Sequence, residues 1–164
     1  MPLSRIILPT NKKRMPDDEQ LRQYMLQTPV ATLPLIPWIL RKIEAYKNAV
    51  PTNLEGMSIT HIMPPAMSAK MQKAWFGTND VSKDEYERIV NLLGNVTLTS
   101  KVTEAHDKDF PTKKEFLATN SPLEINCDVL KATAWGKNEI EQRTNLLVDL
   151  ILKVFPYEKP SEDI

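Results

Sequence analysis

Apolar residues recur at helical spacing in two long stretches of the chain. One apolar face runs through residues 35–47, and a second runs through residues 138–155 until Pro156 ends it. The residues on these two faces are Ile36, Ile39, Leu40, Ile43, Tyr46, Ile140, Leu147, Leu150, Ile151 and Val154. The pattern predicts two amphipathic helices that bury one side against a shared core.

Local start and stop signals predict shorter helices between these two. A Ser, Thr or Asp followed three residues later by Glu or Gln is the capping-box pattern, and it occurs at Asp17, Ser82 and Thr112. Glycine and proline then mark where helices end or begin. We expect helices from Asp17 to before Pro29, over Ser68–Phe76, from Ser82 to Gly94, from Thr112 toward Ala118, and from Ser121-Pro122 onward.

Two short segments follow the two-residue period of a β-strand instead. In the first segment, Met57, Ile59, His61 and Met63 alternate with Ser58, Thr60 and Ile62. Residues 95–99 are rich in Val and Thr. The sequence therefore predicts a mainly α protein with a small β-hairpin, an α+β fold. We divide it into a helical part (1–56), a central part that holds the hairpin (57–119) and C-terminal helices (120–164).

Composition narrows the class of protein. The chain has 164 residues, with 21 basic and 21 acidic side chains and 41% hydrophobic residues, which indicates one packed domain without a global charge bias. The single cysteine, Cys127, excludes an internal disulfide and paired-cysteine zinc sites and favours the cytoplasm. Pro34 and Pro37 break the longest apolar stretch, so we expect no membrane span.

Candidate chemistry is concentrated around one histidine. The chain lacks a phosphate-cradling Gly-rich loop, a Gly-x-Ser-x-Gly elbow and a His-Glu-x-x-His pair. His61 ends the first predicted strand, and Asn95 opens the second. Taken alone, a strand histidine is more often a hydrogen-bonded structural residue, and an asparagine after a glycine is ordinarily a turn residue.

Several separated motifs occur in a familiar order. They are Thr60-His61-Ile62-Met63-Pro64, Gly94-Asn95-Val96-Thr97-Leu98, Phe110-x-x-Lys113, Trp135, and Ile140-Glu141-Gln142-Arg143. This order resembles the C-terminal nuclease domain of the GmrSD-type modification-dependent restriction endonucleases, a branch of the His-Asn-His (HNH) superfamily. The resemblance covers nearly the whole chain and implies a ββα-metal core embedded in a helical domain.

The resemblance also implies roles for the residues of these motifs. His61 would act as the general base, because histidine has a reference pKa of ~6.5 and is poised near neutral pH. Asn95 would orient the His61 ring or hold the loop. One divalent cation, Mg²⁺ or Mn²⁺, would stabilise charge on the scissile phosphate and the leaving oxygen.

Three positions depart from the family pattern. The acidic residue that usually precedes the histidine is Thr60 here, a downstream Asn falls on Val102, and a Ser-Asn pair falls on His106-Asp107. We expect Asp107 to bind the metal, with Glu104 or His106 in place of the lost ligand. The alternative is that residues 104–114 are a solvated loop and helix start.

Two basic residues are candidate substrate contacts. Lys113 would touch a phosphate or simply be exposed, whereas Arg143 would clamp a phosphate or pair with an acidic residue under the active site, and we favour the latter. Basic and acidic side chains are equal in number between residues 57 and 119, which predicts weak non-specific binding to DNA.

The family also implies a separate nucleotide-hydrolysing subunit or domain that recognises the target, and it leaves room for an oligomer. The leading hypothesis is a metal-dependent DNA endonuclease module of a bacterial anti-phage restriction system. The alternative is a catalytically degenerate scaffold that binds nucleic acid or a partner protein. A plain helical interaction domain would require the motifs to be coincidental.

Overall fold

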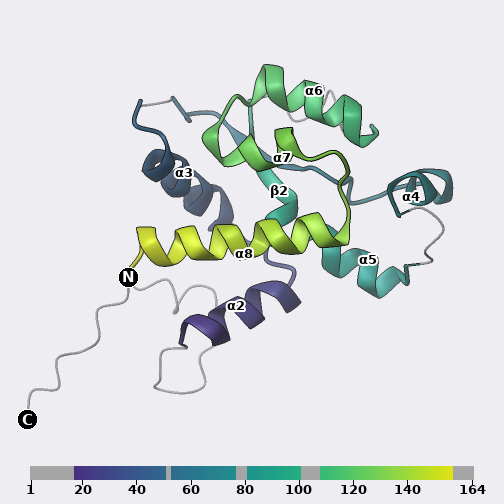
Figure 1. Ribbon diagram of the computed structural model, residues 1–164, viewed down its shortest axis with the longest axis horizontal. Coiled ribbons are helices and arrows are strands. Elements are labelled where there is room, and N and C mark those ends of the chain that lie inside the picture. Colours follow the sequence, from purple (N-terminus) through teal and green to yellow (C-terminus); the bar gives the residue numbers. More distant parts are fainter. Residues whose placement is uncertain (1–16, 51–52, 77–80, 101–107, 157–164) are drawn as a thin grey trace, which may run out of the picture.

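The computed structural model describes residues 17–50, 53–76, 81–100 and 108–156. Its elements follow in the order α2 (Asp18–Gln27), α3 (Ile36–Lys47), β1 (Ser58–His61), α4 (Ala69–Phe76), α5 (Lys83–Val90), η1 (Leu93–Asn95), β2 (Val96–Thr99), α6 (Phe110–Asn120), η2 (Glu124–Asn126), α7 (Cys127–Lys131) and α8 (Lys137–Val154), where η marks a 3₁₀ turn (Figure 1). The fold is mostly helical with a two-stranded sheet, which confirms the predicted α+β class. No helix in the described part is long and apolar enough to cross a membrane.

The two strands are antiparallel but far apart in sequence, because α4, α5 and η1 lie between them. Ile59 pairs with Leu98 and His61 pairs with Val96. Successive strand residues point to opposite faces, so the sheet has an apolar face with Ile59, Val96 and Leu98 and a second face that carries threonines. This second face, the hydroxyl face, consists of Thr60, Thr97 and Thr99, all buried.

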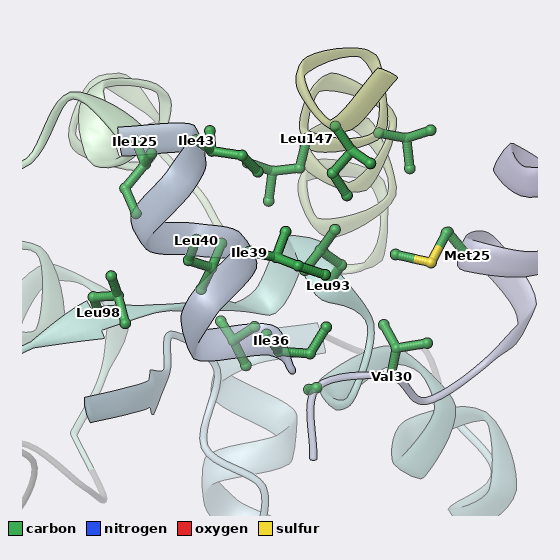
Figure 2. Close-up of a cluster of buried hydrophobic side chains, with 14 of the residues drawn as sticks. Met25, Val30, Ile36, Ile39, Leu40, Ile43, Leu93, Leu98, Ile125 and Leu147 are labelled. Carbon is green, nitrogen blue, oxygen red and sulfur yellow. The ribbon is translucent and has the colours of Figure 1, made fainter. Parts of the chain in front are cut away.

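The long helix α8 organises the interior. It runs across the molecule and contacts α2, α3, α5 and η1 (Figure 1). Its apolar stripe meets the apolar face of α3 and the sheet in one buried cluster (Figure 2). The labelled members of this cluster are Met25, Val30, Ile36, Ile39, Leu40, Ile43, Leu93, Leu98, Ile125 and Leu147. The periodic stripes of the sequence thus correspond to the packed faces, except at Tyr46, which was predicted to lie on the buried face of α3 and is 55% exposed.

A second cluster of buried apolar residues lies around the end of β1. It joins the segment after His61 to α5, α6 and the start of α8, and its members are Ile62, Met63, Tyr86, Ile89, Val90, Leu92, Phe110, Leu117, Val129, Trp135 and Ile140. Complete burial of such side chains contributes about 1.5–3 kcal/mol each relative to exposure. The first cluster thus includes the apolar face of the sheet, and the second includes the segment that follows β1.

Several helix starts agree with the capping signals. Asp17 and Gln20 form the predicted capping box, with the Gln20 backbone N–H donating to the Asp17 carboxylate at 2.8 Å. Ser82 accepts from the Glu85 backbone N–H at 3.2 Å and begins α5. The ends of α3 and α8 also lie within one or two residues of the prediction.

The prediction for the C-terminal end of α5 was wrong. The helix ends at Val90 rather than at Gly94, and Gly94 lies in the turn η1. A Cβ atom at Gly94 would lie 2.1 Å from the Ile140 carbonyl oxygen, closer than any side chain tolerates. The glycine is therefore required by the close approach of η1 to α8 rather than by a helix cap.

Two further helix starts differ from the prediction. Helix α6 begins at Phe110, because the Asp109 carboxylate accepts the Thr112 backbone N–H at 3.0 Å and Pro111 fits the first turn. Ser121 does not open a helix. Its hydroxyl donates to the Leu98 carbonyl of β2, and the next α-helix starts at Cys127. Contact with the sheet overrides the local Ser-Pro signal.

Candidate active site

His61 lies at the end of β1, where the strand leaves the sheet. Its side chain is half-buried, and its Nε2 atom lies 3.2 Å from the Oδ1 atom of Asn91. Asn91 caps the C-terminus of α5, where its Nδ2 donates to the Glu87 carbonyl at 3.0 Å. The ring is thus attached to a neighbouring helix as well as to its own strand.

The bond to Glu87 determines which atom of the Asn91 amide faces the His61 ring. Because the Asn91 NH₂ group faces the Glu87 carbonyl, its carbonyl oxygen faces the ring, and a carbonyl oxygen can only accept. Nε2 of His61 is therefore the protonated nitrogen in this arrangement. The lone pair of the neutral ring then resides on Nδ1.

Asn95 has a different environment, although it was predicted to orient the His61 ring or hold the loop. Its side chain is fully buried. Its Oδ1 accepts from the Met63 backbone N–H at 2.8 Å and from the Trp135 indole N–H at 3.2 Å, while its Nδ2 donates to the Met63 and Val90 carbonyls at 3.0 and 2.8 Å. All four hydrogen-bonding positions of the amide are used. This geometry favours the loop-holding role, and Asn91 supplies the contact to the ring.

Several aromatic side chains pack around the segment that follows His61. The Phe110 ring stacks on Trp135 with centroids 5.7 Å apart and contacts Trp75 at 5.8 Å. The Tyr86 hydroxyl donates to the Pro64 carbonyl, and burial raises its pKa to about 12. The segment that follows His61 therefore packs among residues of α4, α5 and α6 and against Trp135, two residues before α8.

The model of one protein family matches most of the chain. The family is described as GmrSD restriction endonucleases, C-terminal domain, and the match spans residues 15–150. The chain belongs to this family. Comparison with individually characterised proteins gives no match.

Lys113, the lysine of the Phe-x-x-Lys motif in this GmrSD C-terminal domain, is 1% exposed. Its Nζ donates to the Thr60 hydroxyl at 3.2 Å and lies 5.8 Å from the centroid of the Phe116 ring. Burial lowers its pKa from 10.5 to about 8. Since Thr60 precedes His61 in the strand, Lys113 approaches the face of β1 opposite to the histidine. Its ammonium group is enclosed rather than presented to solvent.

Arg143 is also buried, at 1% exposure. Its guanidinium donates to the carbonyls of Gly94, Val96 and Ile125 at 2.8–2.9 Å and pairs with Asp128 at 3.3 Å. Every branch of the fork binds protein groups on η1, β2 and η2. The geometry favours the structural pairing over the phosphate clamp.

The expected metal ligands of this GmrSD domain are not among the described residues. Glu104, His106 and Asp107, together with Val102, fall outside the described residues. Within the described ranges, no three His, Cys, Asp or Glu side chains gather in a way that could hold a metal ion. The described residues around His61 therefore do not form a metal site by themselves. The described chain resumes at residue 108, two residues before Phe110. The Phe110 ring stacks on Trp135, whose indole N–H donates to Asn95. Asn95 precedes Val96, the strand partner of His61.

Sequence reasoning missed two features of the site. Asn91 falls inside the helix that the sequence predicts up to Gly94, so no local signal identifies it as the residue that contacts the ring. The contact between Thr60 and Lys113 joins two positions that the motifs had singled out separately. The sequence therefore identified each of the two residues but not the contact between them.

Proposed function

We propose that this GmrSD C-terminal domain is a metal-dependent DNA endonuclease module of a bacterial anti-phage restriction system, with His61 as its general base. The observation that carries the proposal is the bond from the His61 ring to Asn91, which holds the half-buried imidazole in place at the end of β1. Family membership supports the nuclease class.

The proposed reaction is hydrolysis of a phosphodiester. Nδ1 of His61 accepts a proton from a water molecule as its oxygen attacks phosphorus, and the bond from phosphorus to the leaving sugar oxygen breaks. A proton from solvent completes the leaving alcohol. Asn91 keeps Nε2 protonated and the ring in place during the step.

We further propose that Asp107 and Glu104 hold a magnesium or manganese ion. When bound, the ion would supply positive charge to the scissile phosphate. Oxygen ligands suit both metals. Support comes from the residues that follow them in the chain. Residues 108 and 109 lead into Phe110, whose ring stacks on the Trp135 indole that donates to Asn95.

A second candidate function is a scaffold that binds DNA or a partner protein without cleaving. The observation that favours it is the pair formed by Thr60 and Lys113. Where the family pattern has a carboxylate before the histidine, this chain has a hydroxyl bonded to an ammonium group, and a cation at that place opposes the binding of a second cation.

We also propose that target recognition comes from a separate nucleotide-hydrolysing subunit or domain and that the assembly acts in the cytoplasm. Equal numbers of basic and acidic side chains between residues 57 and 119 support this proposal, because such a module has little non-specific attraction for DNA.

Nicking of a supercoiled plasmid tests the nuclease. We expect nicking with Mg²⁺ or Mn²⁺, none with a chelator, and a rate at least about 100-fold lower for His61→Ala. Asn138→Ala, a change at an exposed position on α8, is the matched control and keeps the wild-type rate. No cleavage by wild type with either metal, with DNA retained in a gel shift, would instead establish the binding scaffold.

A further inference from the structure

The short helix α4 carries positive charge on its outer side. Lys70 and Lys73 are exposed, and the helix contains no acidic residue. Positions three apart share one face of a helix, with Cβ atoms about 5–6 Å from each other. The other exposed residues of this stretch are small, namely Ser68, Ala69 and Ala74. A polyanion could therefore approach both ammonium groups closely.

The inner side of α4 fixes which way the lysines face. Met71 and Trp75 are partly buried, and the Trp75 ring lies 5.8 Å from the Phe110 ring at the start of α6. In Figure 1, α4 lies at the edge of the molecule, on the side away from α3 and from the C-terminal end of α8. The lysine-bearing face is directed outward from this anchor.

The position of α4 is coupled to His61. Seven residues join the strand to the helix, and Asn95 binds both backbone groups of Met63 within that connection. The next carbonyl, at Pro64, accepts the Tyr86 hydroxyl. These bonds fix the first half of the connection that joins His61 to α4.

We propose that the outer face of α4, with Lys70 and Lys73, binds the phosphate backbone of the DNA that His61 cleaves. The inference rests on the proposed function, and it names the surface on which the substrate lies. Ammonium groups at this spacing suit neighbouring phosphates of one strand and read no sequence.

Acidic groups at the starts of α5 and α6 limit this surface. The first turn of α5 carries Asp84 and Glu85. Glu85 is neutralised by Arg88 at 2.8 Å and Lys137 at 2.9 Å, whereas Asp84 is exposed. Asp109 is likewise exposed at the start of α6, so the proposed phosphate contacts are limited to Lys70 and Lys73.

Binding of a short fluorescent duplex, measured by anisotropy with a chelator and 50–200 mM salt, tests the proposal. We expect Lys70→Gln with Lys73→Gln to weaken binding about tenfold at the low-salt end and to reduce the slope of log affinity against log salt by about two. The matched control is Lys47→Gln with Lys153→Gln, which removes two exposed charges from the ends of α3 and α8. This control should leave the slope within about half a unit of wild type.

The outcomes separate this proposal from the nuclease itself. Equal losses in both double variants, or no loss in the α4 variant, would overturn the α4 surface even if His61→Ala abolishes nicking. Absence of binding by wild type at 50 mM salt would overturn it as well. A reduced slope confined to the α4 variant supports the surface, even if wild type never nicks a plasmid, in which case the nuclease proposal alone fails.

Discussion

Two asparagines four residues apart have opposite surroundings in this molecule. Asn95 is fully buried, and its amide makes four hydrogen bonds to Met63, Val90 and Trp135. Asn91 is half-buried at the end of α5, and its amide connects Glu87 to the His61 ring. The asparagine that the family motif singles out thus holds the loop, and the one that the motif does not mention contacts the histidine.

The difference shows how a small nuclease-like domain separates support from chemistry. A buried amide whose four positions are all satisfied stabilises the fold, because losing it leaves several buried partners without a bond. A half-buried amide with one bond to a titratable ring affects mainly the position and protonation of that ring. Burial and saturation, rather than residue type, distinguish the two roles.

Replacing Asn95 tests the supporting role and has the largest expected effect. Asn95→Ala leaves the Met63 backbone groups, the Val90 carbonyl and the Trp135 indole N–H without partners in a buried site. We expect the free energy of unfolding, measured by urea titration, to fall by about 4 kcal/mol. A loss below about 1 kcal/mol would contradict the assignment of Asn95 to the support.

Lys113 provides an intermediate case, because it is buried but titratable. The pKa of Lys113 is about 8 in the folded protein and near 10.5 in the unfolded chain. At pH values between these two, the unfolded chain binds more protons than the native protein. Stability of the wild type should therefore rise with pH, by about 2–3 kcal/mol between pH 8 and 10 relative to Lys113→Met. Above pH 10 the raised pKa of Tyr86 acts in the opposite direction.

Urea titrations of wild type and Lys113→Met from pH 7 to 10 provide the measurement. Parallel stability curves for the two proteins would show that the ammonium group is not held in a desolvated site. The Lys114→Met variant is the matched control, since the side chain of Lys114 reaches the Ala132 carbonyl at 2.7 Å from a less buried position. Its curve should follow that of the wild type.

The sequence was sufficient for the periodic and strongly capped parts of the fold. The stripes of α3 and α8 determine those helices because burial of one face dominates their stability. The sequence was insufficient where contacts between distant segments determine the local structure. Gly94 is needed by the backbone of α8, and Ser121 is engaged by β2, and neither contact is visible in the residues around them.

The same limit applies to the candidate site. The motif order located His61, Lys113 and Arg143, but it did not reveal that the last two are enclosed. A sequence motif records which residues occur together and not which of their atoms face solvent. Asn91 was not found because its only distinguishing feature is a bond to a ring 30 residues earlier in the chain.

Replacing Asn91 tests the chemical side of the comparison and should have the smallest effect on folding. Asn91→Ala removes one bond to the ring and one to the Glu87 carbonyl, so we expect a loss of about 1 kcal/mol in stability. The plasmid-nicking rate should nevertheless fall about 10-fold to 100-fold, because an unanchored ring leaves the position needed for attack. An unchanged rate would show that this bond does not position the base.

Asn91→Asp separates the position of the ring from its protonation. The carboxylate still accepts a hydrogen bond from the Nε2–H group of His61, so most of the rate lost in Asn91→Ala should return. Its negative charge, however, favours the imidazolium form of His61. Because the base must be neutral, the rising limb of the pH–rate profile should move about one unit to higher pH. Recovery of the rate without this movement would mean that Asn91 only supports the loop, and the two asparagines would then share one role.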